Sequence, residues 1–234
     1  MPKTLMNNAQ VATKKIAKKT HTAPAPANVV APEYWLDACL HLMKKDRVMK
    51  RLIPQFGEAC LQSRGAPFIT LARSIVGQQI SVKAAQTVWD RFARLSKNMT
   101  AANVLKLKVD DMRAAGLSAR KIEYLVDLSL HFDSGALHPD NWPGMDDEAI
   151  IAELVAIRGI GRWTAEMFLI FHLMRPNVLP LDDIGLINGI SQSYFSGEAV
   201  SRSEIREVAT AWAPYCSVAT WYIWRSLDPL PVEY

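Results

Sequence analysis

The amino-acid sequence predicts an all-α protein. Half of its 234 residues are hydrophobic, which is enough to form one substantial core or two small ones. From residue 32 onward, apolar residues recur at the three- and four-residue spacing of amphipathic helices, and candidate capping residues precede several of these segments. No segment alternates apolar and polar residues convincingly, and no hairpin turn joins two such segments, so we expect no β-sheet.

Four helices are predicted in the first half of the folded part. The first opens with Pro32, a residue favoured in the first turn of a helix. Ser81 and Ser118 can cap the third and fourth, because a serine side chain accepts a hydrogen bond from a first-turn N–H. These helices cover residues 32–46, 66–79, 81–95 and 118–132, and the first places Trp35, Ala38, Cys39 and Leu42 on one face.

The helical pattern continues in the second half. Acidic residues open a helix at 146–157, which is expected to bury Ile150, Ile151, Leu154 and Val155. The run MFLIFHLM at 167–174 is apolar on all sides, but it is far shorter than the roughly 20 residues that span a bilayer. We therefore predict a buried central helix there. Two further helices are expected over residues 203–213 and 215–227.

The first 31 residues differ in composition from the rest. They contain five lysines and no acidic residue, and subtracting these five charges from the net charge of +4 leaves about −1 for residues 32–234. Their alternating Ala and Pro residues cannot pack a core. We predict a disordered basic tail over residues 1–31 and one folded domain over 32–234. The tail is either a solubilising leader or an arm that adds non-specific DNA affinity; an organellar presequence is a further alternative, although the lack of arginine counts against it.

The three cysteines, Cys39, Cys60 and Cys216, lie far apart and share no metal-ligand spacing, and the five histidines are scattered. This distribution indicates reduced thiols in the cytoplasm. It argues against a disulfide framework and against an iron–sulfur cluster.

A tight turn in the stretch IRGIGRWTAEMF, residues 157–168, separates two helical patterns. Its glycines, Gly159 and Gly161, permit positive φ, so that the turn and the next helix can offer backbone N–H groups that bind a phosphate. An ordinary helical corner is an alternative of similar weight. A second feature favours binding, because Asp182 and Asp183 stand before another apolar helix in NVLPLDDIGLINGI.

Together these stretches resemble the helix-hairpin-helix DNA glycosylase superfamily, and within it the 3-methyladenine DNA glycosylase II branch. The resemblance rests on L-x-x-I-x-G-I-G-x-W-T-A, on the Pro-x-Asp-Asp that follows it, and on YWLDACLHLMKKD, SIVGQQISVKAA and WAPYCSVATWYIWRSL. It covers roughly residues 32–228. It implies two helical lobes with an active-site cleft between them, no iron–sulfur cluster, and double-stranded DNA as the partner.

The resemblance also implies which loops touch DNA. The loop GQQIS at 77–81 is similar to one that enters the duplex as a wedge, with Gln79 at the wedge position and Ile80 beside it. A polar turn that caps the next helix is the alternative. In relatives the hairpin carbonyls can hold a monovalent cation, and no side-chain metal site or other cofactor is expected. At the hairpin, the implied DNA-binding residues are Arg158, Gly159, Ile160, Gly161 and Thr164.

The family's catalytic carboxylate is the second of the acidic pair, Asp183. Cleavage of an N-glycosidic bond builds positive charge on the sugar, which a fixed carboxylate stabilises. Helix N-capping is the alternative role of Asp183; we expect Asp182 to cap the helix or to support Asp183. Bifunctional relatives carry a nucleophilic lysine where this chain has Trp163, so the resemblance implies a glycosylase without lyase activity.

The base pocket is expected to be electron-rich. Alkylated purines such as 3-methyladenine carry positive charge in the nucleotide, and tryptophan faces attract cations. Trp163 and Trp224 match aromatic pocket positions of the family. Met167 and Ile184 fall where some relatives have tyrosines, so we expect a narrower or shifted substrate range. For Trp35, Trp89, Trp212 and Trp221, burial in the core is the default interpretation.

The resemblance thus implies a monofunctional DNA glycosylase of base excision repair. Such an enzyme flips 3-methyladenine or 7-methylguanine out of duplex DNA, hydrolyses the N-glycosidic bond and leaves an abasic site. One alternative is a non-catalytic helix-hairpin-helix DNA-binding module, which would need neither Asp183 nor Trp224. Another is a glycosylase for deaminated or oxidised bases. We expect a monomer that does not bind membranes and is cytoplasmic, or nucleoid-associated if the source is bacterial.

Overall fold

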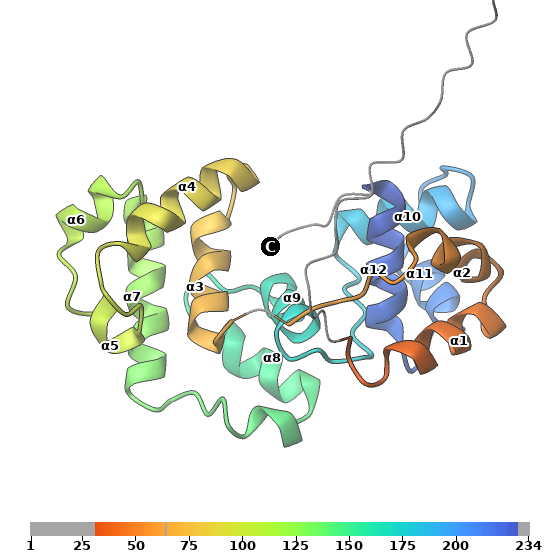
Figure 1. The fold of residues 1–234 in the computed structure, drawn as a ribbon, viewed down its shortest axis with the longest axis horizontal. Helices are drawn as coiled ribbons and strands as arrows, with labels where there is room; N and C mark the ends of the chain where they lie inside the picture. Colours follow the sequence, from red (N-terminus) through yellow and green to blue (C-terminus); the bar gives the residue numbers. More distant parts are fainter. Residues whose placement is uncertain (1–30, 64, 229–234) are drawn as a thin grey trace, which may run out of the picture.

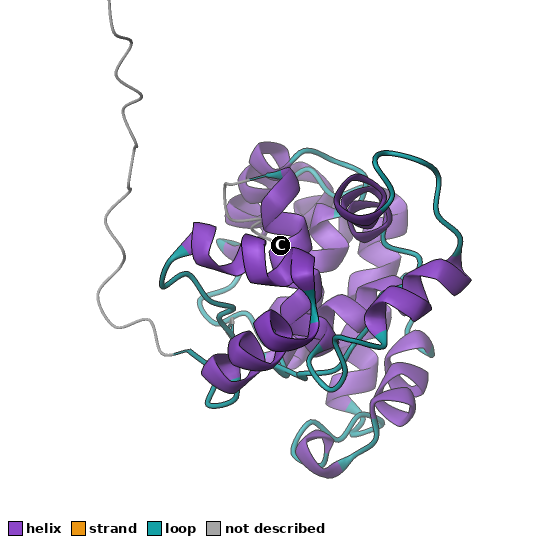
Figure 2. Ribbon diagram, turned by 90° about the vertical axis from the view of Figure 1, so that its right-hand side faces the viewer, coloured by secondary structure: helices purple, strands orange, loops and turns teal. Residues whose placement is uncertain are grey.

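The computed structural model describes residues 31–63 and 65–228, so the predicted tail over residues 1–31 lies outside the described residues except for Ala31. Within the described ranges the chain forms helices and loops and no strand, as Figure 2 shows. The predicted all-α class is confirmed.

Twelve α-helices and two short 3₁₀ helices follow one another along the described ranges. They are α1 (Trp35–Lys45), α2 (Arg47–Leu52), η1 (Ile53–Phe56), α3 (Pro67–Gly77), α4 (Val82–Ala93), α5 (Ala101–Val104), α6 (Val109–Ala114), α7 (Ala119–Asp133), η2 (Trp142–Gly144), α8 (Asp147–Val155), α9 (Arg162–Phe171), α10 (Ile184–Tyr194), α11 (Arg202–Ala209) and α12 (Cys216–Leu227).

The helices gather into two groups (Figure 1). On one side α3 packs against α4 and α7, and α7 also packs against α5 and α6. On the other side α12 packs against α1, α2 and α10. Helix α9 lies between the two groups in Figure 1 and packs against α3 and α8. Residues from both groups can therefore meet at α9.

Local capping explains where several helices begin. The side chains of Ser81 and Ser118 accept hydrogen bonds from first-turn N–H groups of α4 and α7, as predicted. Asp146 caps α8 in the same way, where the sequence predicted an acidic helix start. Helix α6 begins after Lys108, which makes no side-chain cap. Asp110 and Asp111 lie inside its first turn, where their negative charges interact favourably with the helix dipole.

Two predictions about burial and helix bounds were wrong. Val155 is 44% exposed, because it lies about 100° around α8 from the buried Leu154 and falls outside the buried stripe. The central helix is not residues 167–174 but α9, which ends at Phe171. The chain leaves the helix there because Met174 has a φ of 55° and Pro176 cannot continue a helix. The buried character was predicted correctly for the part of the run up to Ile170.

A buried carboxylate ties the N-terminal helices to the α10–α12 side. Asp46 caps α2 through Oδ1, while its Oδ2 accepts hydrogen bonds from Tyr194 Oη at 2.8 Å and from Trp212 Nε1 at 3.2 Å. Burial and this carboxylate raise the pKa of the Tyr194 hydroxyl, which therefore stays a donor. Trp212 is fully buried, as expected of a packing residue.

Candidate active site

Asp183 forms the N-cap of α10 and is almost completely buried, with 6% of its surface exposed. Its Oδ1 accepts a hydrogen bond of 2.6 Å from the backbone N–H of Leu186. The capping role that the sequence left as an alternative is thus present, but it uses only Oδ1 of the carboxylate.

Two tryptophans from different helices hold the rest of the Asp183 carboxylate. Trp224 Nε1 on α12 donates to Oδ1 at 2.7 Å, and Trp163 Nε1 on α9 donates to Oδ2 at 2.8 Å. With the Leu186 amide, the carboxylate accepts three N–H groups from α9, α10 and α12. Hydrogen bonds to an ionised group are shorter and stronger than neutral ones, so this arrangement fixes the carboxylate in one orientation.

Asp182 has a different environment. The prediction that it might serve as the cap was wrong, because Asp183 occupies that position. Asp182 Oδ1 instead pairs with the guanidinium of Arg202, the first residue of α11, and its side chain is more than half exposed. The two neighbouring acids therefore point to different partners, and only Asp183 lies in the buried tryptophan cluster.

The two tryptophans offer very different surfaces. The ring of Trp224 is buried and stacks on Phe171, with centroids 5.7 Å apart and planes 12° from parallel. Trp163 is 38% exposed. Phe171 was missed by the sequence reasoning, since the apolar run that contains it gave no sign of which side chain would stack.

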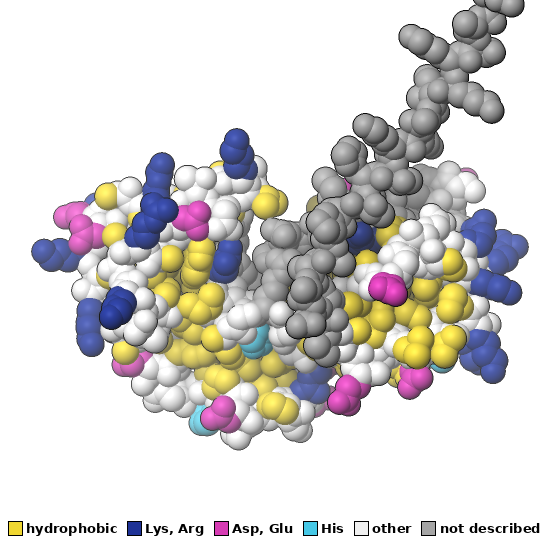
Figure 3. Space-filling view, viewed as in Figure 1, with side chains coloured by type: hydrophobic (Ala, Val, Ile, Leu, Met, Phe, Trp, Pro, Cys, Tyr) yellow, Lys and Arg dark blue, Asp and Glu magenta, His cyan; other side chains and the backbone are white. Residues whose placement is uncertain are grey.

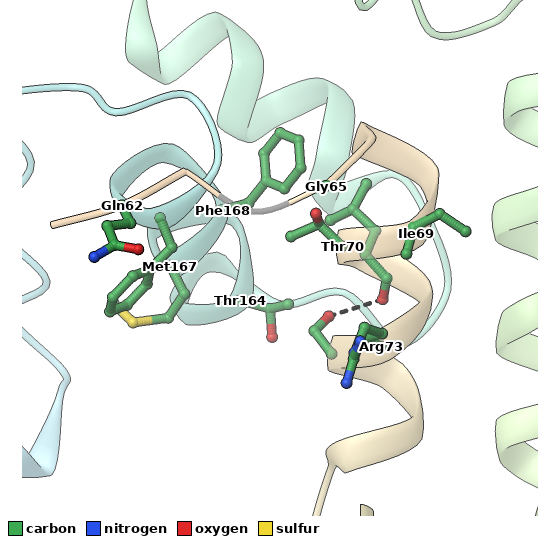
Figure 4. Close-up of a pocket in the computed structure, with 11 residues that line it drawn as sticks. Gln62, Gly65, Ile69, Thr70, Arg73, Thr164, Met167 and Phe168 are labelled. Carbon is green, nitrogen blue, oxygen red and sulfur yellow. Dashed lines mark hydrogen bonds between the residues drawn. The ribbon is translucent and has the colours of Figure 1, made fainter. Parts of the chain in front are cut away.

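Two cavities that share lining residues lie between α3 and α9. Their volumes are about 420 and 470 Å³. In the first, Thr164 on α9 and Arg73 on α3 lie on facing sides (Figure 4). Trp163 and Gln79 line the second, which thereby adjoins both the Asp183 cluster and the predicted wedge. The residues common to both cavities are Arg73, Ser74, Thr164 and Met167.

The structure distributes the predicted pocket residues unequally. Met167 is buried and lines both cavities. Ile184, the first residue of α10, is 72% exposed and is not among the residues that line them. Thr164, predicted with the hairpin, lines the cavities instead.

The predicted hairpin can accept only a glycine at position 159. Gly159 has a φ of 86°, and a Cβ atom there would come within 2.2 Å of the Tyr124 ring. Next to it, the N–H of Arg158 donates to Asp127 Oδ2 at 2.8 Å, and Ile160 is buried. Gly161 is the N-cap of α9 and makes no side-chain cap, so backbone groups alone form this helix start.

The charges beside the hairpin are already paired. Arg162, the first residue of α9, forms ion pairs with Glu148 and, at 3.0 Å, with Glu166. Burial raises the pKa of the Glu166 carboxyl, and Arg162 opposes that shift. Figure 3 shows the Lys and Arg side chains of one face gathered mainly toward its two ends, with apolar side chains between them. Because Arg162 is already paired, a phosphate bound at the hairpin would meet mainly backbone amides.

The predicted wedge lies where α3 ends. Gln79 has a φ of 60°, which is uncommon for a residue with a side chain. Ile80 is 39% exposed although its side chain is large and apolar. The alternative interpretation is also present, since Ser81 caps α4. Both roles fit the same loop.

Neither a metal cluster nor a membrane span is found in the part of the chain that the structure describes. No group of three or more His, Cys, Asp or Glu side chains there could hold a metal ion. None of its helices combines the length and hydropathy of a membrane-spanning segment.

Residues 72–214 match the family model of the HhH-GPD superfamily base excision DNA repair proteins. The chain belongs to this family. The matched segment contains the wedge loop, the hairpin and Asp183, and Trp224 lies beyond its end.

Individual relatives agree with the family match. The chain is 31% identical to DNA-3-methyladenine glycosylase 1 of Schizosaccharomyces pombe, over 80% of this chain and 85% of that protein. A crystal structure of DNA-3-methyladenine glycosidase from Bacillus halodurans superposes with a TM-score of 0.76 at 35% identity, covering 82% of this chain and 89% of that one. The S. pombe enzyme in complex with abasic DNA gives 0.73 at 31%, covering 85% and 99%.

The hairpin geometry of this HhH-GPD protein predicts that its two glycines respond differently to substitution. Gly159→Ala should lower the free energy of unfolding by about 2 kcal/mol or more, because the methyl group meets Tyr124 and the backbone has positive φ. Gly161→Ala should cost about 1 kcal/mol or less, since its φ is −93° and nothing lies within 4 Å of the added atom. Urea unfolding of both variants measures the difference, and equal losses would show that the Tyr124 contact does not constrain the hairpin.

Proposed function

We propose that this protein is a monofunctional DNA glycosylase of base excision repair, which excises alkylated purines of the 3-methyladenine and 7-methylguanine type from duplex DNA. The observation that carries this proposal is the Asp183 carboxylate, held by Trp163 and Trp224 beside two cavities. Family membership and the names of the relatives support the same activity. The cavities between α3 and α9 form the proposed active-site cleft, within a proposed two-lobed domain over residues 32–234.

Asp183 supplies the proposed electrostatic stabilisation. As the glycosidic bond breaks, the sugar gains positive charge, and an anion at about 5 Å with an effective dielectric near 20 stabilises it by roughly 3 kcal/mol, or about two orders of magnitude in rate. The three N–H donors keep the carboxylate in place, so little reorganisation is needed when the charge develops. Water completes the hydrolysis, and the proposed reaction needs no cofactor.

The flipped base is proposed to enter the cavities lined by Met167 and Thr164. Volumes of about 420 and 470 Å³ fall within the roughly 300–1,000 Å³ range of small-molecule sites. Trp163 is partly exposed and lines the second cavity, so its ring is the proposed aromatic partner of a cationic base. Trp224 was expected to stack on the base, but its ring is buried against Phe171, and the geometry favours a role in positioning Asp183.

Substitution of the two neighbouring acids tests the proposal. With a duplex containing 3-methyladenine, the wild-type protein should release that base, and Asp183→Asn should slow release by at least about a hundredfold under single-turnover conditions. Asparagine is a good N-cap, so the fold should be retained. The matched control, Asp182→Asn, should lose little, because Asp182 pairs with Arg202 at the surface.

Three outcomes would contradict this account. Equal losses in both variants would remove the special role of Asp183. Covalent trapping of the enzyme on DNA by borohydride would reveal lyase chemistry, for which Trp163 provides no nucleophilic amine. Release of deaminated or oxidised bases only, or of no base at all, would exclude the proposed substrate class, and the last result would favour a non-catalytic DNA-binding module.

The hydrogen bond that Trp224 donates to Asp183 can be tested separately from the packing of its ring. Trp224→Phe keeps an aromatic ring that can stack on Phe171 but removes the N–H donor to Asp183. We expect the single-turnover excision rate to fall about tenfold or more, with unchanged affinity for an abasic-site analogue. Trp221→Phe is the control, since that ring lies on the same helix and packs edge-on against Trp35. A loss of DNA affinity in Trp224→Phe, with an unchanged rate constant for the bound complex, would instead assign Trp224 to DNA binding.

A further inference from the structure

Gln78 joins two loops that lie far apart in the sequence. It is the C-cap residue of α3, immediately before the predicted wedge residue Gln79. Its Nε2 donates a hydrogen bond of 2.8 Å to the carbonyl oxygen of Gly159, 81 residues away in the hairpin. A side-chain amide thus connects the start of the wedge loop directly to the turn that is proposed to hold phosphate.

The backbone on both sides of this hydrogen bond adopts the left-handed region. Gln79 has a φ of 60° and Gly159 a φ of 86°. For a residue with a Cβ atom this region is unfavourable, and such conformations persist only where the surroundings hold them. At Gly159 the Tyr124 ring leaves no room for a side chain. The Gln78 hydrogen bond therefore connects two turns whose shapes are closely defined.

One face of α7 supports both turns. Lys121 Nζ donates to the carbonyl of Val76, in the last turn of α3, at 2.7 Å. One helical turn further on, Tyr124 packs on Gly159, and the next turn brings Asp127 to the N–H of Arg158. Residues 121, 124 and 127 follow the three-residue spacing that places side chains on one side of a helix. Helix α7 thus contacts both turns, and the Gln78 side chain connects the two turns directly.

We propose that Gln78 is a positioning residue that fixes the wedge loop relative to the phosphate-binding hairpin, so that both act on the same nucleotide. The inference rests on the proposed function. The hairpin holds the backbone through its amides, and the wedge must enter the base stack at a defined distance from that phosphate. Extrusion breaks the stacking and pairing of the target nucleotide, so a displaced wedge raises the barrier to extrusion.

The experiment compares extrusion with chemistry. Gln78→Met keeps the length and volume of the side chain but removes the donor to Gly159. Single-turnover release of 3-methyladenine is measured from a fully paired duplex and from the same duplex with the damaged nucleotide opposite an abasic site, where less pairing must be broken. We expect the release rate to fall about tenfold on the paired duplex and much less on the duplex with the abasic site. A 2-aminopurine beside the target nucleotide should show a slower fluorescence rise on the paired duplex.

The control variant is Gln55→Met. Gln55 Nε2 also donates to a backbone carbonyl at 2.8 Å, that of Arg51, but on the surface of the N-terminal helices. It should release base from both duplexes at the wild-type rate. Equal losses of Gln78→Met on the two duplexes, or no loss on either, would overturn the positioning role. Failure of the wild-type protein to release base from either duplex would instead overturn the proposed function.

Discussion

The position of the Asp183 carboxylate is the constraint on which the candidate site depends. Three N–H donors reach it from α9, α10 and α12, so the site exists only when these helices pack correctly. A buried carboxylate is costly unless its oxygens are hydrogen-bonded, and here both oxygens are. The same residue caps α10, which means that folding the helix and placing the proposed catalytic group are one event.

We propose that DNA binding at the hairpin depends on backbone geometry rather than on net charge. Residues 32–234 carry a net charge of about −1, and Arg162 at the start of α9 is paired with two glutamates. The hairpin can still attract a phosphate, because a helix N-terminus offers N–H groups and a partial positive charge. Tyr124 closes the space beside Gly159, and Gln78 connects this turn to the wedge loop. Rigid turns of this kind can place a few groups accurately around one nucleotide.

The sequence was informative where a local rule applied and uninformative where distant residues meet. Capping rules predicted the starts of α4, α7 and α8, whereas α2, α5 and α6 have only four to six residues and are too short for a periodic pattern. Family motifs singled out Asp183, yet no local signal showed that two indole N–H groups would hold it. Ile184 follows Asp183 but is exposed on the first turn of α10. The Gln78 contact spans 81 residues, and sequence spacing carries no trace of such a contact.

The most direct test of the account observes the two indole N–H groups themselves. In a proton–nitrogen NMR spectrum, the Asp183→Asn variant should shift the Nε1 resonances of Trp163 and Trp224, because both lose a charged acceptor. The Nε1 resonance of Trp142, which donates to Glu153, should stay in place. If the resonances of Trp163 and Trp224 did not move, the carboxylate would not be held by the tryptophans, and the central claim would be wrong.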